Sequence, residues 1–181
     1  MKVMKLSGII VRSVIIAGLT IAGNWNVDSA NAKVTFSVKG PFGTVHGSFT
    51  GLKATIKFDE KDLAGSSVSA SIEASTVNTG IGLRNHDLRT EEQWLNTDKF
   101  PQITFHSNKI EKTANGYKAI GELTLKGTTK PAEIPFTFTG KENTGLFKGQ
   151  FQINREDYKV GKQGGSVGSI ITINLEVPVK K

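Results

Sequence analysis

The stretch IPFTFTGKENTGLFKGQFQI, residues 134–153, decides the fold class. Its first half, 134–138, carries an apolar side chain at every second position, and its second half, 147–153, repeats that period. Successive side chains of a β-strand point to opposite faces, so each half is expected to form a strand with one apolar and one polar face. The Asn-Thr-Gly run at 143–145 is typical of the turn that joins two such strands into a hairpin.

The same period recurs on both sides of this hairpin. It is present in six further segments: 34–38, 52–58, 68–74, 103–105, 119–125 and 171–177. Turn-forming residues lie between the periodic segments, at 40–43, 62–67, 115–116 and 161–165. Buried parallel strands would be apolar on both faces, so the pattern predicts eight or nine antiparallel strands with hairpin-length connections.

An open sheet of this size would expose two edges and an uncovered apolar face. Closure into a barrel removes both problems, and an eight-stranded barrel is just wide enough to be filled by side chains or to hold one small ligand. A two-sheet sandwich is the competing architecture. Small residues on the inward phase favour the barrel because they leave room inside: Ala54, Ala70, Ala74, Ala119, Gly121 and Gly149. We therefore predict an all-β, antiparallel up-and-down barrel.

One segment, residues 80–101, lacks the two-residue period. Thr90 followed by Gln93 matches a capping box, which favours a helix that begins at this point. Trp94 and Leu95 would supply its apolar side. The sequence thus predicts one or two short helices inserted between strands.

The first 22 residues are typical of a secretory signal peptide, and residues 23–181 are expected to form one domain. The leader has basic residues and no acid before a short apolar run, 13–22, that ends in small residues. Arg12 interrupts the apolar residues, so a short membrane anchor or an amphipathic leader helix is the alternative. Export predicts a periplasmic or secreted protein without a stable membrane anchor once the leader is removed.

Charge and cysteine content exclude several classes of protein. The chain has 23 Lys and Arg against 16 Asp and Glu, a formal charge of +7. The leader holds three of those bases, so the remainder has 20 bases against 16 acids, or +4, which gives little support for a nucleic-acid partner. Because there is no Cys, disulfides, zinc–thiolate sites, a thiol nucleophile and a lipid-modified N-terminal Cys are excluded.

Catalytic and metal-binding motifs are sparse. Residues 164–168 spell G-x-S-x-G, but no Asp or His follows Ser166, and a strand is expected after it, so we interpret the match as a Gly-rich turn. His46, His86 and His106 are too far apart for a local metal motif. We therefore expect no enzyme activity, no metal and no catalytic cofactor.

Five segments of the sequence resemble, in order, the conserved blocks of the YceI-like family of lipocalin-like, polyisoprenoid-binding proteins. They are NWNVDSANAKVTFSVKG (24–40), RNHDLRTEEQWLNTDKFPQITFHS (84–107), GYKAIGELTLKGTTKPAEIPF (116–136), INREDYKVG (153–161) and GGSVGSIITINLEV (164–177). The chain departs from the family pattern at Asp87, where the family usually has His, and His86 stands one place earlier. No head-group role is therefore carried over to that position.

The resemblance implies a lipocalin-like barrel that holds a long isoprenoid or related amphiphilic lipid in its lumen, usually in the periplasm. The lipid would be the ligand of a binding protein that needs no other cofactor. An exported stress or structural protein with a packed barrel, or an enzyme whose site the sequence does not reveal, is the alternative. A homodimer is left open.

Two groups of residues are the candidate ligand contacts. The inward phase of the strands supplies the lumen candidates: Phe36, Ile56, Phe58, Ile72, Phe105, Leu123, Phe136, Phe138, Phe151 and Ile173. Arg84 and Trp94 in the helical insert, together with Arg155 after a strand, are expected at the mouth, where a guanidinium suits a phosphate or quinone oxygen. The alternative for the arginines is local ion pairing, Arg84 with Asp87 and Arg155 with Asp157.

Overall fold

The computed structural model describes residues 23–181, and the expected leader lies outside them. The elements are β1 (Asn24–Val27), β2 (Lys33–Gly40), β3 (Gly43–Phe49), β4 (Lys53–Lys57), β5 (Ser67–Glu73), η1 (Ala74–Thr76), α1 (Gly82–Thr90), β6 (Gln102–Thr113), β7 (Gly116–Leu125), β8 (Thr128–Lys141), β9 (Thr144–Asn154), η2 (Arg155–Tyr158) and β10 (Ile170–Lys180). No helix within 23–181 is long and apolar enough to span a bilayer.

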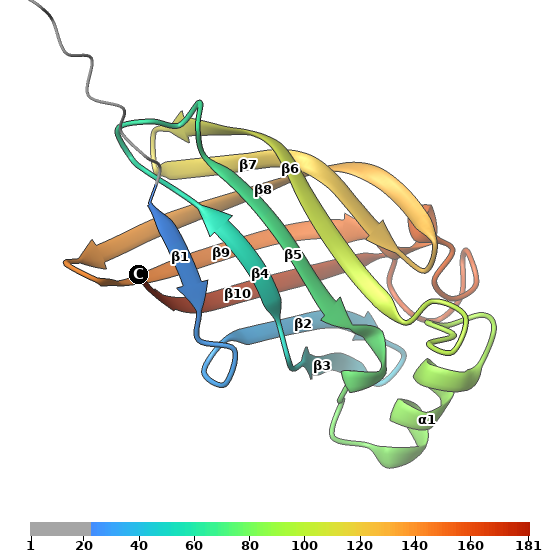
Figure 1. The fold of residues 1–181 in the computed structure, drawn as a ribbon. Helices are drawn as coiled ribbons and strands as arrows, with labels where there is room; N and C mark the ends of the chain where they lie inside the picture. The colour runs from blue at the N-terminus through green and yellow to red at the C-terminus, as the bar shows by residue number, and fades with distance from the viewer. Residues whose placement is uncertain (1–22) are drawn as a thin grey trace, which may run out of the picture.

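Strand β1 closes the sheet into a barrel. From β4 to β10 each strand pairs antiparallel with the next strand in sequence, and β1 then bridges the two ends of this series (Figure 1). Trp25 pairs with Ile56 of β4, and Val27 pairs with Val179 of β10. A closed ring has no free edges, so the predicted up-and-down barrel is confirmed and the two-sheet sandwich is excluded.

The β2–β3 hairpin extends the ring on one side. Strands β1 and β2 pair with different parts of β10, so they share one position of the ring. Strand β3 pairs with β2 and β4 pairs with β1, so β3 and β4 share the next position. Ser48 of β3 exchanges two backbone hydrogen bonds, both 2.9 Å, with Asn78 after β5. Ten strand segments therefore fill about eight positions around the barrel. The prediction of eight or nine strands overlooked β1 and β3.

Helix α1 ends where the capping-box pattern predicted a helix to begin. The Thr90 hydroxyl donates to the carbonyl of His86 at 3.0 Å, so it bonds to the preceding helical turn and caps no helix after it. The chain then folds back, and the backbone N–H of Leu95 donates to the carbonyl of Leu88 at 3.0 Å. A helix in the insert is confirmed, but its expected start was wrong, because burial of Leu95 outweighs the local capping preference.

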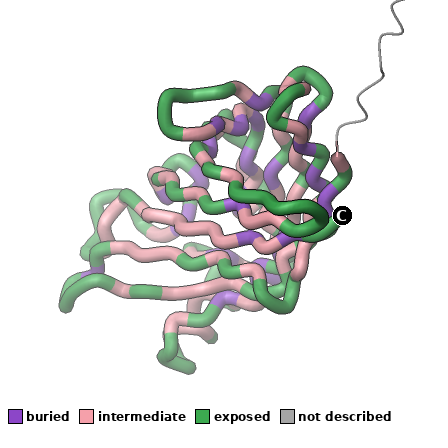
Figure 2. The backbone as a smooth tube through the Cα atoms, turned by 90° about the vertical axis from the view of Figure 1, so that its left-hand side faces the viewer, coloured by how far each residue is buried: buried purple, intermediate pink, exposed green. Residues whose placement is uncertain are grey.

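The two ends of the barrel carry different connections. Helix α1, the β2–β3 turn, η2 and the loop 161–169 lie at one end, which we call the mouth end (Figure 1). The turns 114–115 and 142–143 and the C-terminus lie at the other, the sealed end. Between them, buried and exposed segments alternate along the strands while the turns are exposed (Figure 2), as expected for a sheet with one apolar face.

Candidate functional site

A cavity of about 850 Å³ occupies the barrel interior. Every strand from β2 to β10 contributes side chains to its wall, and most of them are aliphatic or aromatic. Eleven of the thirteen residues predicted as ligand contacts lie on its lining: Phe36, Ile56, Ile72, Arg84, Trp94, Phe105, Leu123, Phe136, Phe151, Arg155 and Ile173. The two-residue period therefore identified the inward face of the strands, whereas binding of a ligand by these residues stays a prediction.

Phe58 and Phe138 were also predicted to line the cavity, but they lie beyond its floor. The Phe58 ring is 5.2 Å from that of Phe138 and 5.0 Å from that of Tyr117, measured between centroids. It also packs against Phe136 and Phe147, with centroids 5.6 and 5.4 Å away, whose rings do line the cavity. The inward direction was predicted correctly, but these two rings fill the sealed end.

Hydrogen bonds and a cation–π contact complete the sealed end. The indole N–H of Trp25 donates to the carbonyl of Phe58 at 3.1 Å, and the ammonium group of Lys181 lies 5.1 Å from the Trp25 ring. The Tyr117 hydroxyl donates to the Glu60 carboxylate at 2.6 Å. This hydrogen bond, helped by burial, raises the pKa of Tyr117 to about 12.

Small residues make room in the lumen at four of the six predicted positions. Ala54, Ala70, Ala119 and Gly149 lie on the cavity lining, whereas Ala74 is buried in η1. Gly121 has another role: a Cβ there would overlap the backbone at His106, next to the irregular pairing of β6 and β7. Glycine at that position allows close approach of two backbones at a bulge.

Three segments surround the mouth of the cavity. The tip of the β2–β3 hairpin contributes residues 40–43, helix α1 contributes Arg84, Asp87 and Leu88, and the loop after η2 contributes Val160 and Val167. Sequence reasoning treated the hairpin tip only as a turn and so missed the contribution of Phe42 to the lining. The signal present in the sequence was a large aromatic residue within a Gly-Pro-Phe-Gly turn, where polar residues are more usual.

Asparagine side chains hold α1 beside the mouth. The Asn85 side-chain oxygen accepts hydrogen bonds from the backbone N–H and the hydroxyl of Thr79, both 2.7 Å. The Asn85 amide donates in turn to the side chain of Asn78 at 3.1 Å, and the backbone of Asn78 pairs with β3. Since α1 buries no residue fully, we infer that these polar links largely set its position.

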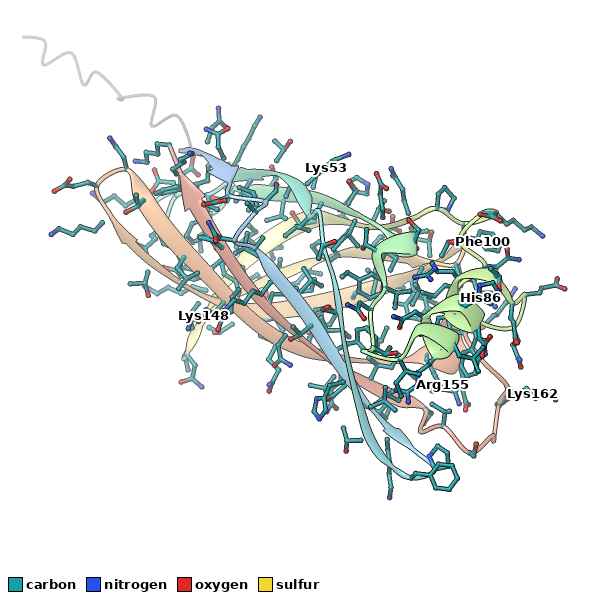
Figure 3. All side chains as sticks on the ribbon, turned by 90° about the horizontal axis from the view of Figure 1, so that it is seen from below. Lys53, His86, Phe100, Lys148, Arg155 and Lys162 are labelled. Atoms are coloured by element: carbon teal, nitrogen blue, oxygen red, sulfur yellow. The ribbon has the colours of Figure 1, made fainter. Side chains whose placement is uncertain are left out.

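Arg155 is almost completely buried, with 2% of its surface exposed. Its guanidinium donates to the carbonyls of Gly168, Val160, Lys162 and Val167 at 2.9, 2.6, 3.1 and 2.7 Å. Its acidic partner is Glu156 at 3.4 Å rather than the Asp157 expected from the sequence. The donors that were predicted to reach a lipid head group instead bind the backbone of the loop 161–169. Figure 3 shows Arg155 and this loop, with Lys162, at the same end of the barrel as α1.

Arg84 occupies a different environment at the same mouth. It is half-buried on the cavity lining, and none of the ion pairs found within 23–181 includes it. The predicted pairing with Asp87 is absent from those ion pairs, although both side chains line the cavity. Arg84 therefore places a cationic group at the mouth of the cavity.

Trp94 packs between the helical insert and the loop after η2. A Cβ built on Gly161 would lie 2.5 Å from the Trp94 ring and 2.8 Å from Nη1 of Arg155. The backbone N–H of Gly161 donates to the carbonyl of Gln93 at 2.6 Å. Lys126 adds a further link, because its ammonium donates to the carbonyl of Lys159 at 2.7 Å, and burial lowers the pKa of Lys126.

The remaining chemical motifs are dispersed. His46, His86 and His106 lie on β3, α1 and β6, with exposed side chains, and Nδ1 of His106 is 3.0 Å from the Ser69 hydroxyl on the outer wall. Within the described chain no three His, Asp or Glu side chains are grouped to hold a metal ion. The G-x-S-x-G match lies in the loop 161–169 and is followed by a strand, as the turn interpretation predicted.

Comparison with known proteins places this fold in a family. The model of the YceI-like domain matches residues 25–179. A UPF0312 protein of Yersinia enterocolitica is 34% identical over 170 residues, which cover 89% of this chain and 88% of that protein. The crystal structure of Burkholderia cenocepacia BcnA is similar with a TM-score of 0.78 at 28% identity, over 84% of this chain and 99% of that one.

A more distant similarity concerns the fold alone. The structure described as a polyisoprenoid binding domain from Saccharophagus degradans has a TM-score of 0.64 at 13% identity, over 88% of this chain and 98% of that one. The resemblance noted in the five sequence blocks agrees with the family model and with the relatives above 25% identity. On these grounds the chain belongs to the YceI-like family.

Proposed function

We propose that this chain is an exported protein that binds a long-chain isoprenoid or related amphiphilic lipid in the barrel lumen. The observation that carries the proposal is the cavity of about 850 Å³ with a largely apolar wall, a floor of packed aromatic rings and a mouth that holds polar groups. Such an arrangement matches a molecule with a long apolar chain and one polar end.

The size of the cavity agrees with this ligand class. Pockets that enclose drug-sized ligands measure about 300–1,000 Å³, so this lumen is near the upper end of that range. Each buried methylene contributes about 0.8 kcal/mol, and a long chain has more driving force than specific binding requires. Ordering of the chain and its entry through the mouth are therefore expected to limit affinity.

The polarity of the lining supports one orientation of the lipid. The floor is aromatic, and Arg84, which none of the ion pairs found within 23–181 includes, lies at the mouth beside Asp87. A guanidinium presents several fixed donors to a phosphate or quinone oxygen. We expect the apolar tail to point toward Phe136 and Phe147 and the head group to lie near Arg84, while Arg155 acts through the shape of the loop.

Family membership and the fold neighbours add support of a coarser kind. The Saccharophagus domain is described as polyisoprenoid-binding, and its fold is shared by this chain. The alternative, an exported stress or structural protein whose barrel is packed shut, agrees less well with an interior that contains a cavity of this volume. A barrel filled by its own side chains would leave little empty space.

The proposal is tested by lipid extraction and by a pair of tryptophan substitutions on β7. Mass spectrometry of an organic extract of the purified protein should detect a stoichiometric amphiphilic lipid.

Leu123→Trp would fill lumen space and reduce lipid uptake, at a stability cost of about 1–3 kcal/mol. Thr124→Trp introduces the same side chain one residue later on the outer face and should leave uptake unchanged. Equal uptake by both folded variants, or no lipid in the extract, would contradict the proposal.

The head-group role of Arg84 has its own matched comparison. Arg84→Gln should weaken binding of a lipid with a charged or quinone head group while binding of a bare hydrocarbon chain stays near normal. Arg89→Gln removes a charge from the same helix at a position outside the cavity lining and serves as the control. If both variants bind both lipids equally, Arg84 has no part in recognition.

Export is tested by the mass of the mature chain. In the native host, residues 1–22 should be absent from the exported protein, because a charged start, a short apolar run and a small-residue exit direct cleavage. An intact mass that includes Met1–Ala22 would instead favour the anchor or leader-helix alternative.

A further inference from the structure

Exposed apolar side chains are concentrated at the mouth end. Within residues 23–181, four large hydrophobic residues are exposed: Phe42 (102%), Leu83 (73%), Ile81 (49%) and Ile170 (48%). Phe42 is at the tip of the β2–β3 hairpin, Ile81 and Leu83 are at the start of α1, and Ile170 begins β10. Figures 1 and 3 show these segments at the same end of the barrel. Single exposed hydrophobic residues are common, but their concentration at one end is informative.

The surface of the sealed end is polar. Its turns, 114–115 and 142–143, contain Ala, Asn and Glu, and its large apolar side chains are packed inside the aromatic cluster. None of the exposed large hydrophobic residues found within 23–181 belongs to this end. The barrel is thus polar at the end that is closed and partly apolar at the end where the cavity opens.

Cationic side chains accompany the apolar ones at the mouth. Lys39 lies on the hairpin and Lys162 on the neighbouring loop, both exposed, and the two segments are joined by the Gly168 N–H to Lys39 carbonyl hydrogen bond of 2.7 Å. Arg84 is on the facing helix.

The mouth end also carries acidic groups, of which Asp87 is half-buried on the cavity lining and Asp157 is exposed on η2. Glu156 is engaged by Arg155 and by the backbone of Gly164. Glu91 and Glu92 follow the C-terminal end of α1, where Glu92 interacts electrostatically with Lys126. The side of the mouth that carries Phe42, Leu83, Lys39 and Lys162 therefore combines apolar tips with positive charge.

We infer that the mouth end is a docking face for a lipid bilayer with anionic phospholipid head groups. Phe42, Ile81 and Leu83 enter the interface between head groups and acyl chains, while Lys39 and Lys162 contact the anionic head groups. Interfacial binding of this kind increases with buried apolar area and with attraction to anionic lipid. Because Phe42 also lines the cavity, docking would place the lumen in contact with the bilayer, and an apolar chain could pass between them without crossing water.

A bilayer suits this surface better than a second protein. A stable protein interface buries about 800 Å² on each partner around a packed apolar centre. Here the apolar side chains project separately from a hairpin tip, a helix start and a strand start, so they do not form such a centre. Separate projections that insert between lipids need no complementary partner surface.

Vesicle co-sedimentation tests the inference with the leader-free chain. It should bind vesicles of phosphatidylcholine with phosphatidylglycerol more tightly than vesicles of phosphatidylcholine alone. The double substitution Phe42→Ser, Leu83→Ser should weaken binding about tenfold or more. Lys39→Gln with Lys162→Gln should weaken binding several-fold, whereas Lys61→Gln with Lys112→Gln, the same charge change in exposed residues at the sealed end, should have no effect. Equal losses in the two lysine pairs, or no binding by the wild-type chain, would overturn the inference.

The orientation can be measured directly because the chain has no cysteine. An environment-sensitive dye on Ser166→Cys, in the mouth-end loop, should report a less polar surrounding when vesicles are added. The same dye on Asn143→Cys, in a sealed-end turn, should not. A response from both sites, or from Asn143→Cys alone, would contradict docking through the mouth.

Two further outcomes separate this inference from its alternatives and from lipid binding in the lumen. The chain could dimerise in the absence of vesicles, in a way that depends on its concentration and is abolished by Leu83→Ser. This result would assign the exposed apolar side chains to contact with a second copy and would overturn bilayer docking. Leu83 is not on the cavity lining, so Leu83→Ser should still take up lipid delivered from detergent while losing vesicle binding. If the wild-type chain binds vesicles but takes up no lipid in its lumen, the proposed function is contradicted while bilayer docking is supported.

Discussion

The two ends of the barrel are stabilised by different interactions. At the sealed end, Phe58 is 2% exposed and packs against four other rings, so burial of apolar surface holds this end together. At the mouth, Arg155 is equally buried, but its neighbours are backbone carbonyls of the loop 161–169. The mouth end has a cavity where the sealed end has packed rings, so hydrogen bonds to the backbone take the place of apolar packing in holding its loops.

The largest expected effect is at the sealed end. Phe58→Ala should lower the free energy of unfolding by about 3–5 kcal/mol, because it removes a buried ring and leaves a cavity among four others. Phe42→Ala removes the same ring at the mouth, where it is fully exposed, and should change stability by no more than about 0.5 kcal/mol. Chemical denaturation of both variants measures the difference, and similar losses would show that the two ends do not differ as described.

The next effect concerns the polar core of the mouth. Arg155→Ala should cost about 3 kcal/mol, because it leaves several buried carbonyls without a donor. Arg155→Lys should recover only part of this, since an ammonium cannot reproduce the fixed fork of a guanidinium. Hydrogen exchange should increase first in 160–169 and not in the sealed end. Uniform exchange throughout the barrel would mean that Arg155 supports the whole fold rather than this loop.

Two glycines of the same loop separate backbone strain from packing. Gly161 and Gly164 both have positive φ, +72° and +65°, but only a Cβ on Gly161 meets neighbours, the Trp94 ring and Arg155. Gly161→Ala should therefore cost about 2 kcal/mol, and Gly164→Ala about 1 kcal/mol from the left-handed conformation alone. Equal unfolding free energies for the two variants would indicate that the contact between Gly161 and Trp94 is not tight.

Periodicity predicted the long strands well because each has a continuous apolar face. The two overlooked strands give little signal: β1 is four residues with Trp25 and Val27 as its inward pair, and β3 has glycines at its start and at Gly47. Closure was inferred from the need to remove edges, yet the strand that closes the ring could not be named. Pairing of β1 with both β4 and β10 depends on tertiary arrangement, which a local pattern does not contain.

For the candidate site, the sequence predicted which side chains point into the barrel better than it predicted how far along the barrel axis they lie. The alternating pattern placed both Phe105 and Phe58 inside the barrel, but it cannot tell how far along the barrel axis a side chain lies, and only Phe105 reaches the cavity. Arg155 was expected at the rim because it follows the strand that contains Ile153 and because a guanidinium suits a lipid head group. Its carbonyl partners come largely from the loop 161–169, in which Gly161 and Gly164 have positive φ. The sequence of this loop has no periodic pattern from which its path could be predicted.

The smallest effect is a pH dependence at the sealed end. Tyr117 donates to the Glu60 carboxylate, and this hydrogen bond, followed by burial and the negative charge of Glu60, raises the pKa of Tyr117 from 10.0 to about 12. The unfolded chain therefore loses its phenolic proton at lower pH than the folded chain. The stabilisation is fully present below pH 10 and is lost as the pH rises toward about 12.

Tyr117→Phe keeps the ring among its aromatic neighbours and should cost about 1 kcal/mol at neutral pH through the lost hydrogen bond. The difference in unfolding free energy between wild type and Tyr117→Phe should then shrink between pH 10 and 12, while other titrating groups cancel in the comparison. Because the chain has two tyrosines, phenolate absorbance of Tyr158→Phe reports Tyr117 alone, and adding Glu60→Gln should move its titration to lower pH. Stability curves of wild type and Tyr117→Phe that run parallel through this range would show that folding does not raise the pKa of Tyr117.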